Sequence, residues 1–63
     1  MTMEFVANEI YVDREGIEYR YLERRSGVHV FENVDTNQRL VLNLQGRYRW
    51  DDQDHPRDII GKK

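Results

Sequence analysis

Arginines alternate with aromatic residues in two short runs, RYRW at residues 47–50 and YRY at residues 19–21. Single-stranded nucleic acid is bound where cations and stacking aromatic rings line one groove. In a β-strand, however, successive side chains point to opposite faces. We therefore predict that the aromatic residues of both runs join a core while the arginines face solvent.

Nucleic-acid binding remains an alternative, because arginines are concentrated in the middle of the chain. Four of them, Arg20, Arg24, Arg47 and Arg49, could line one outer face of a sheet. A nucleic-acid-binding module with an arginine-rich sheet face would use Arg20, Arg24, Arg25, Arg39, Arg47 and Arg49. The formal net charge of −2 argues against this function, since proteins that bind phosphate backbones usually carry an excess of basic residues.

His29 is the residue best suited to acid–base catalysis, and Ser26 lies shortly before it in the chain. A Ser–His pair needs a third group that orients the histidine, and a sheltered pocket. A chain of 63 residues has little room for such a pocket, so we predict a turn at Ser26 and no enzyme activity. A small metal-independent nuclease that uses His29 with Glu and Arg residues is the second alternative.

Metal and cofactor sites are not expected either. The acidic run DDQDHPRD at residues 51–58 lacks the glycine and the final glutamate of a calcium loop. The chain has no cysteine, which excludes thiolate zinc sites and disulfides. We predict no metal, no cofactor and no small-molecule substrate, and we interpret residues 51–63 as a polar, acidic and flexible C-terminal tail.

Turn signals divide the rest of the chain into short segments. They are DREG, RSG, DTNQ and QG, at residues 13–16, 25–27, 35–38 and 45–46, and they contain residue types that favour tight turns. Between them apolar and polar residues alternate, as in half-buried strands. This pattern predicts an all-β fold. We expect a small antiparallel meander of four to five strands, either an SH3-like barrel or an open sheet, in one domain over residues 1–50.

One face of these strands is predicted to form the core, with Ile10, Val12, Ile17, Tyr19, Tyr21, Val28, Val30, Leu40, Leu42, Leu44, Tyr48 and Trp50. A domain of about 60 residues buries little of its surface, so a partner would supply useful extra burial. Clustered apolar side chains on the opposite face would mark the partner surface. The first hypothesis is therefore a non-enzymatic interaction or regulatory protein that binds a protein partner, or a second copy as a homodimer, through Tyr11, Leu22, Phe31 and Val41.

No apolar run is long enough to cross a membrane as a helix. The N-terminal residues also lack the basic and apolar regions of a signal peptide. We expect a soluble, cytoplasmic protein without a membrane partner. Short chains of this kind are often accessory or regulatory factors, including phage-encoded ones.

Overall fold

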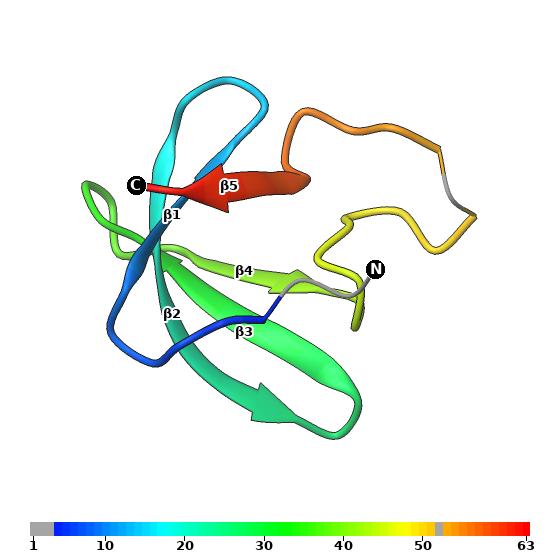
Figure 1. Cartoon of the computed structure of the whole chain (residues 1–63), viewed down its shortest axis with the longest axis horizontal. Coiled ribbons are helices and arrows are strands. Elements are labelled where there is room, and N and C mark those ends of the chain that lie inside the picture. The colour runs from blue at the N-terminus through cyan, green and yellow to red at the C-terminus, as the bar shows by residue number, and fades with distance from the viewer. Residues whose placement is uncertain (1–3, 52) are drawn as a thin grey trace.

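The computed structural model describes residues 4–51 and 53–63, and these residues form one antiparallel sheet (Figure 1). Its strands are β1 (Ile10–Asp13), β2 (Glu18–Arg25), β3 (Val28–Asn33), β4 (Arg39–Leu42) and β5 (Ile59–Lys62). Neighbouring strands follow the order β4-β3-β2-β1-β5, and the described residues contain no helix. The prediction of a small antiparallel all-β fold is therefore confirmed, with an open sheet of five strands.

The strands β1 to β4 form the predicted meander, in which each strand pairs with the next one along the chain. The turn between β2 and β3 is made by Ser26 and Gly27, whose φ angles are both positive, at 49° and 82°. Two such residues in succession give the tight turn whose twist matches a β-hairpin. The predicted turns before β2 and β4 also occur, at residues 14–15 and 34–36.

The strand β5 overturns the prediction for the C-terminus. It pairs with β1, with Tyr11 opposite Lys62 and Val12 opposite Gly61. Its first residue, Ile59, is buried in the core. The prediction of a flexible tail over residues 51–63 is therefore wrong for residues 59–62. The polar composition of this region did not predict a strand. A four-residue edge strand nevertheless forms there, because it needs only one well-buried side chain.

The strand expected at residues 47–50 does not form. This run belongs to the connection between β4 and β5, drawn from yellow to orange in Figure 1. Its backbone bonds locally rather than in a ladder: the Asn43 N–H donates to the Arg47 carbonyl at 2.9 Å. Side chains predicted for the core are consequently exposed in this connection, and Trp50 has 71% of its surface in solvent. The other exposed residues from the predicted core are Ile17, Leu44 and Tyr48.

The core lies on one face of the sheet and is dominated by aromatic rings. The ring centroid of Phe5, which precedes β1, lies 5.0 Å from that of Tyr11 and 5.0 Å from that of Phe31. The buried members of this cluster are Tyr11, Tyr19, Tyr21, Phe31, Leu40, Leu42 and Ile59. Predicted burial is right for Tyr19, Tyr21, Val30, Leu40 and Leu42.

The strand β1 faces the core with the opposite phase from the prediction. Tyr11 and Asp13 are buried, whereas Ile10 and Val12 are half-buried. Alternation could not decide between the two faces, because both carry apolar side chains. Tyr11 presents its aromatic ring, which is larger than the side chains of Ile10 and Val12, to the core. Its hydroxyl group accepts a hydrogen bond from the Val6 N–H at 2.7 Å. Burial of the ring therefore leaves no unpaired hydroxyl group.

A β-bulge at Leu22 changes the phase of β2. Tyr21 lies opposite Phe31, but Glu23 lies opposite Val30, so that Leu22 is an extra residue in the strand. An extra residue reverses the alternation of side chains beyond it. The side chain of Arg24 therefore projects from the same face of the sheet as that of Tyr21, which an unbroken strand would forbid.

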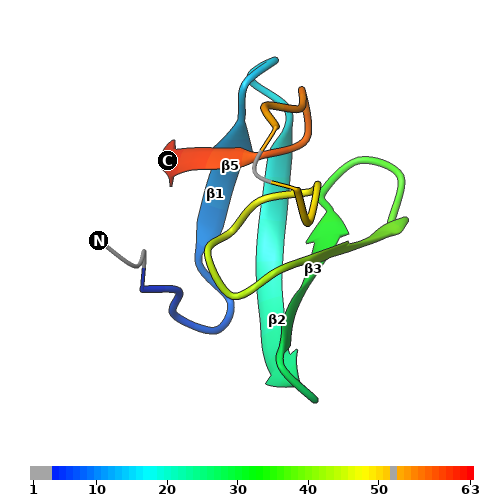
Figure 2. The ribbon, with the colours of Figure 1, turned by 90° about the vertical axis from the view of Figure 1, so that its right-hand side faces the viewer.

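The sheet is strongly twisted, and the chain links its two edges (Figures 1 and 2). The connection that follows the edge strand β4 reaches the other edge strand, β5. Specifically, the Ile59 N–H donates a hydrogen bond to the Gly46 carbonyl at 3.0 Å. This contact brings the residues that follow β4 near the turn end of the β2–β3 hairpin and the segment before β1, where two pockets lie.

Candidate functional site

The residues predicted to bind a protein partner do not form a surface patch. Tyr11 and Phe31 have only 2% and 0% of their surface exposed, so the prediction is wrong for both. Their aromatic rings fill the core, because burial of these rings removes a large apolar area from water. Leu22 is half-buried at the bulge, and Val41 is exposed on the edge strand β4.

The six arginines proposed for nucleic acid do not share one face of the sheet. Arg20 and Arg39 alternate with buried residues on β2 and β4 and face away from the core. Arg24 projects from the core face, and two further arginines lie in the connection between β4 and β5. Four of the six form ion pairs with carboxylates: Arg20 with Glu32, Arg25 with Glu23, Arg47 with Asp54 and Asp58, and Arg49 with Asp51.

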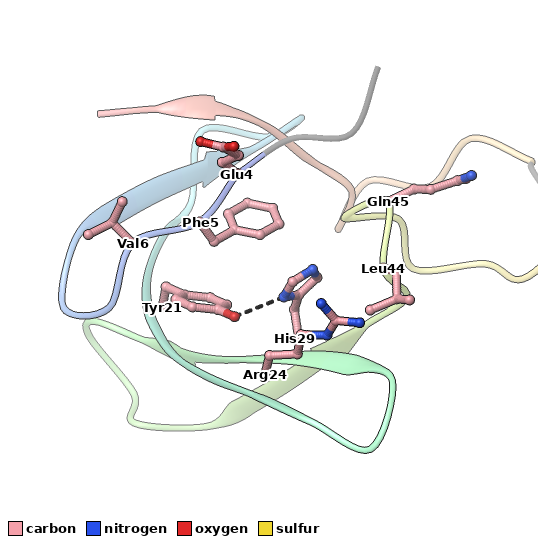
Figure 3. A pocket seen from close by; sticks show the side chains of 8 residues that line it. All are labelled: Glu4, Phe5, Val6, Tyr21, Arg24, His29, Leu44 and Gln45. Carbon is pink, nitrogen blue, oxygen red and sulfur yellow. Dashed lines mark hydrogen bonds between the residues drawn. The ribbon is translucent and has the colours of Figure 1, made fainter.

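A pocket of about 560 Å³ opens at the end of the aromatic core. Phe5 and Val6 come from the segment before β1, Tyr21 and Arg24 from β2, and Leu44 from the residues after β4 (Figure 3). The remaining side chains that line it are those of Glu4, His29 and Gln45. The bulge is what places both β2 residues in one pocket, and no sequence signal pointed to that bulge.

His29 forms part of the pocket wall and is 8% exposed. Its Nδ1 lies 2.9 Å from the Tyr21 hydroxyl oxygen, and its ring packs edge-on against Phe5 with centroids 4.8 Å apart (Figure 3). Burial lowers the pKa of His29, a hydrogen bond with the Leu44 backbone opposes this effect, and the cation of Arg24 lowers the pKa further. Ser26 lies in the β2–β3 turn and does not line this pocket.

A second pocket of about 300 Å³ adjoins the first. Leu44 and Gln45 line both pockets, and Trp50 and Gly27 line the second together with Asn43. Leu44 is 38% exposed and Trp50 71% exposed, so both present apolar surface to solvent. The two pockets and the ridge of Leu44 between them are called the Leu44 groove below.

Asn43 holds the residues of the Leu44 groove in place. It is 7% exposed, and its Oδ1 accepts hydrogen bonds from the Gln45 and Arg47 N–H groups at 2.9 and 3.0 Å. Its Nδ2 donates to the Arg49 carbonyl at 3.2 Å. A single buried amide thus fixes the backbone on either side of Gly46. Asn is common in turns for this reason, but no role for Asn43 was predicted from the sequence.

Asp58 anchors the other end of the same connection and is 1% exposed. Its carboxylate accepts hydrogen bonds from the Tyr48 N–H at 2.8 Å and the His55 N–H at 3.0 Å. Arg14 donates to it at 3.2 Å. Burial alone would raise the pKa of Asp58, but these hydrogen bonds and the nearby cation of Arg47 outweigh it and lower the pKa.

The Leu44 groove offers apolar walls, the Arg24 guanidinium group, the Glu4 carboxylate and the His29 ring, all of which can bind a ligand noncovalently. Within residues 4–51 and 53–63, no group of three or more His, Cys, Asp or Glu side chains could hold a metal ion. The same ranges include no helix able to cross a membrane.

Comparison with protein-family models, curated proteins and solved structures found no match to this chain. Any function must therefore be inferred from the geometry and the chemistry of its side chains.

Proposed function

We propose that this chain is a non-enzymatic protein-binding module, and that the Leu44 groove holds an extended segment of a partner protein. The observation that carries the proposal is the exposed indole of Trp50 in the second pocket, together with the exposed side chain of Leu44, which lines both pockets. Tryptophan is enriched among the residues that dominate the binding energy of protein interfaces. An extended chain that crosses the ridge of Leu44 would place one side chain in each pocket.

The anchoring of the groove supports this proposal. The backbone that carries Leu44 and Trp50 is tied to the side chain of Asn43, while Asp58 holds the backbone of Tyr48. A surface that is ordered before binding loses little conformational entropy when a partner arrives. Exposed apolar side chains on such a surface have no evident structural role, and clustered ones mark binding sites.

Selection of peptides from a random display library against the immobilised protein tests the proposal. Selected peptides should bind the unmodified protein and shift the emission of Trp50, the only tryptophan in the chain, to shorter wavelength. Leu44→Asp should abolish binding. Val41→Asp is the matched control, because Val41 is 50% exposed but lies on the edge strand β4 outside the groove. Failure to select any peptide, or loss of binding in Val41→Asp alone, would contradict the proposal.

A second copy of the chain is the other occupant that the groove would accept. Sedimentation of the protein with and without Leu44→Asp distinguishes the two cases. If the unmodified protein is a dimer and the Leu44→Asp variant is a monomer, the occupant of the groove is a second copy of the chain and not a separate partner. A monomer in both forms would leave the partner protein as the occupant.

We further propose that the architecture is a small SH3-like barrel. We also propose that the protein has a regulatory role in the cytoplasm. The strand order and the hydrogen bond from Ile59 to Gly46 support the barrel, because they bring the two edges of the sheet towards each other. A shared architecture implies no shared function. The function proposed above therefore depends on the groove and not on the barrel.

A further inference from the structure

We infer that the partner segment carries a carboxylate next to an apolar side chain, and that Arg24 binds this carboxylate at the first pocket. The inference rests on the proposed function, since it names the chemistry of the segment that the Leu44 groove would hold. It follows from where Arg24 points and from which charges surround it.

The bulge at Leu22 directs Arg24 into the groove. Beyond the bulge, Arg24 lies opposite His29 on β3, so both side chains project from the core face of the sheet. Figure 3 shows the Arg24 guanidinium group beside the His29 ring, on the side of the pocket that Leu44 also lines. The cation therefore lies at the edge of an apolar wall rather than on the outer face with Arg20.

No carboxylate among residues 4–51 and 53–63 forms an ion pair with Arg24. Its sequence neighbour Glu23 projects from the other face and pairs with Arg25 at 3.0 Å. Glu4 also lines the pocket, but Figure 3 shows it on the far side, well separated from Arg24. The two charged groups thus lie at opposite sides of the pocket, which leaves the guanidinium group available to a ligand.

A carboxylate is the group that best matches this arrangement. Arginine presents a planar set of N–H donors that fits a carboxylate with two parallel hydrogen bonds. The apolar surfaces of Phe5 and Leu44 would exclude water from one side of that pair and strengthen it. They would also receive an apolar side chain next to the acidic one. A segment with adjacent acidic and apolar residues therefore complements both the charge and the shape of the pocket.

A positional-scanning library of short N-acetylated peptide amides tests the inference, because only side chains carry charge in such peptides. The library is applied to the unmodified protein and to three variants: Arg24→Gln, Arg24→Glu and Arg25→Gln. The last is the matched control, since Arg25 is the next residue, is exposed like Arg24, and faces away from the pocket. Circular dichroism confirms that each variant is folded.

The unmodified protein and Arg25→Gln should both select Asp or Glu beside an apolar residue. Arg24→Gln should lose the acidic preference but keep the apolar one, and Arg24→Glu should select Lys or Arg instead. For one selected peptide, Arg24→Gln should weaken binding about tenfold or more, as expected for a hydrogen-bonded charge pair. The same peptide with Gln in place of its acidic residue should bind both proteins equally.

Four results would overturn the inference. Apolar selection without an acidic preference, or an acidic preference that persists in Arg24→Gln, would remove Arg24 as the recognition residue while the proposed function stands. Failure of the unmodified protein to retain any peptide would remove both. Binding of mixed-sequence DNA or RNA oligomers at low salt that Arg24→Gln abolishes would assign the pocket to phosphate groups instead.

Discussion

The Tyr21 hydroxyl oxygen lies 2.9 Å from Nδ1 of His29, inside the wall of the first pocket. The two residues are not directly opposite each other, because Tyr21 faces Phe31 and His29 faces Arg24 across the bulge. A neutral imidazole can accept the hydroxyl hydrogen at Nδ1, whereas an imidazolium ion has hydrogen on both nitrogens and cannot. Burial and the neighbouring guanidinium group both favour the neutral form of His29, in which Nδ1 can accept this hydrogen bond.

We expect the protein to lose stability as the pH falls below about 6.5, the ordinary pKa of histidine. Burial lowers the pKa of His29, so in this range the unfolded chain binds a proton that the folded chain does not. The contribution of His29 to the free energy of unfolding is complete above pH ~6.5 and decreases down to the pKa of the folded state. Urea unfolding across this range measures it, and His29→Gln should remove it. An NMR titration midpoint of His29 at or above the ordinary value would contradict this expectation.

Asp58 should contribute far more to stability than Asp54, although both bind the same two arginines. Asp58→Asn should cost about 3 kcal/mol, because a buried carboxylate that accepts several hydrogen bonds is lost. Asp54→Asn should cost at most about 1 kcal/mol, since the Asp54 side chain is 75% exposed. Urea unfolding at neutral pH measures both changes. Equal losses in the two variants would show that the buried carboxylate contributes no more to the free energy of unfolding than the exposed one.

The lowered pKa of Asp58 also predicts an acid limit to stability. Its folded-state pKa lies below its unfolded value, so its contribution is complete above pH ~4 and is lost as the pH falls through the folded pKa. Acid titration of the unfolding free energy should therefore be shallower below pH ~4 in Asp58→Asn than in the unmodified protein. Parallel curves for the two proteins would rule out this role.

Gly46 should tolerate alanine less well than Gly16, although their φ angles are nearly equal at 79° and 80°. A Cβ atom at residue 46 would lie 3.0 Å from Cζ of Phe5, whereas one at residue 16 would meet nothing within 4 Å. Gly16→Ala should cost only the backbone strain, about 1–2 kcal/mol. Gly46→Ala should cost more, because Phe5 is packed among aromatic rings and cannot move freely. Thermal unfolding of the two variants measures the difference, and equal losses would show that the ring moves without cost.

Trp50→Ala should leave the fold intact, with a change in stability within about 0.5 kcal/mol, because the indole is 71% exposed. Phe31→Ala should cost about 3–5 kcal/mol, because Phe31 is fully buried. Far-UV circular dichroism and urea unfolding distinguish the two. Unfolding of the Trp50 variant would show that the indole packs inward and would also remove the basis of the Leu44 groove.

The strands from β1 to β4 could be predicted from the sequence because turn residues and alternation agree there. The phase of β1 could not, since Ile10, Tyr11 and Val12 are all apolar, and burial of one ring decided between the faces. The fifth strand was assigned to the wrong segment for a related reason. RYRW alternates well but has no neighbour to pair with, whereas Ile59–Lys62 alternates poorly but pairs with β1.

The groove itself could not be predicted from the sequence. It depends on the bulge at Leu22, which brings Tyr21 and Arg24 to one side of β2, and on a connection fixed by Asn43 and Asp58. The bulge arises from the pairing of β2 with β3, and the connection is held by hydrogen bonds between the side chains of Asn43 and Asp58 and backbone groups two to ten residues away, which no simple sequence pattern marks. The sequence singled out Arg24 and His29 as chemically competent residues, but only the fold shows that they face each other across two strands.

The place of β5 beside β1 has a consequence for the order in which the fold assembles. The β2–β3 hairpin is closed by a two-residue turn, so its formation requires little loss of chain entropy. The pairing of β1 with β5 joins residues near opposite ends of the chain and gives the fold a large share of nonlocal contacts. Because nonlocal pairing slows folding, we expect the hairpin to form first and β5 to dock in the slowest step. The Leu44 groove, which depends on the connection that β5 holds in place, would then be the last part of the molecule to become ordered.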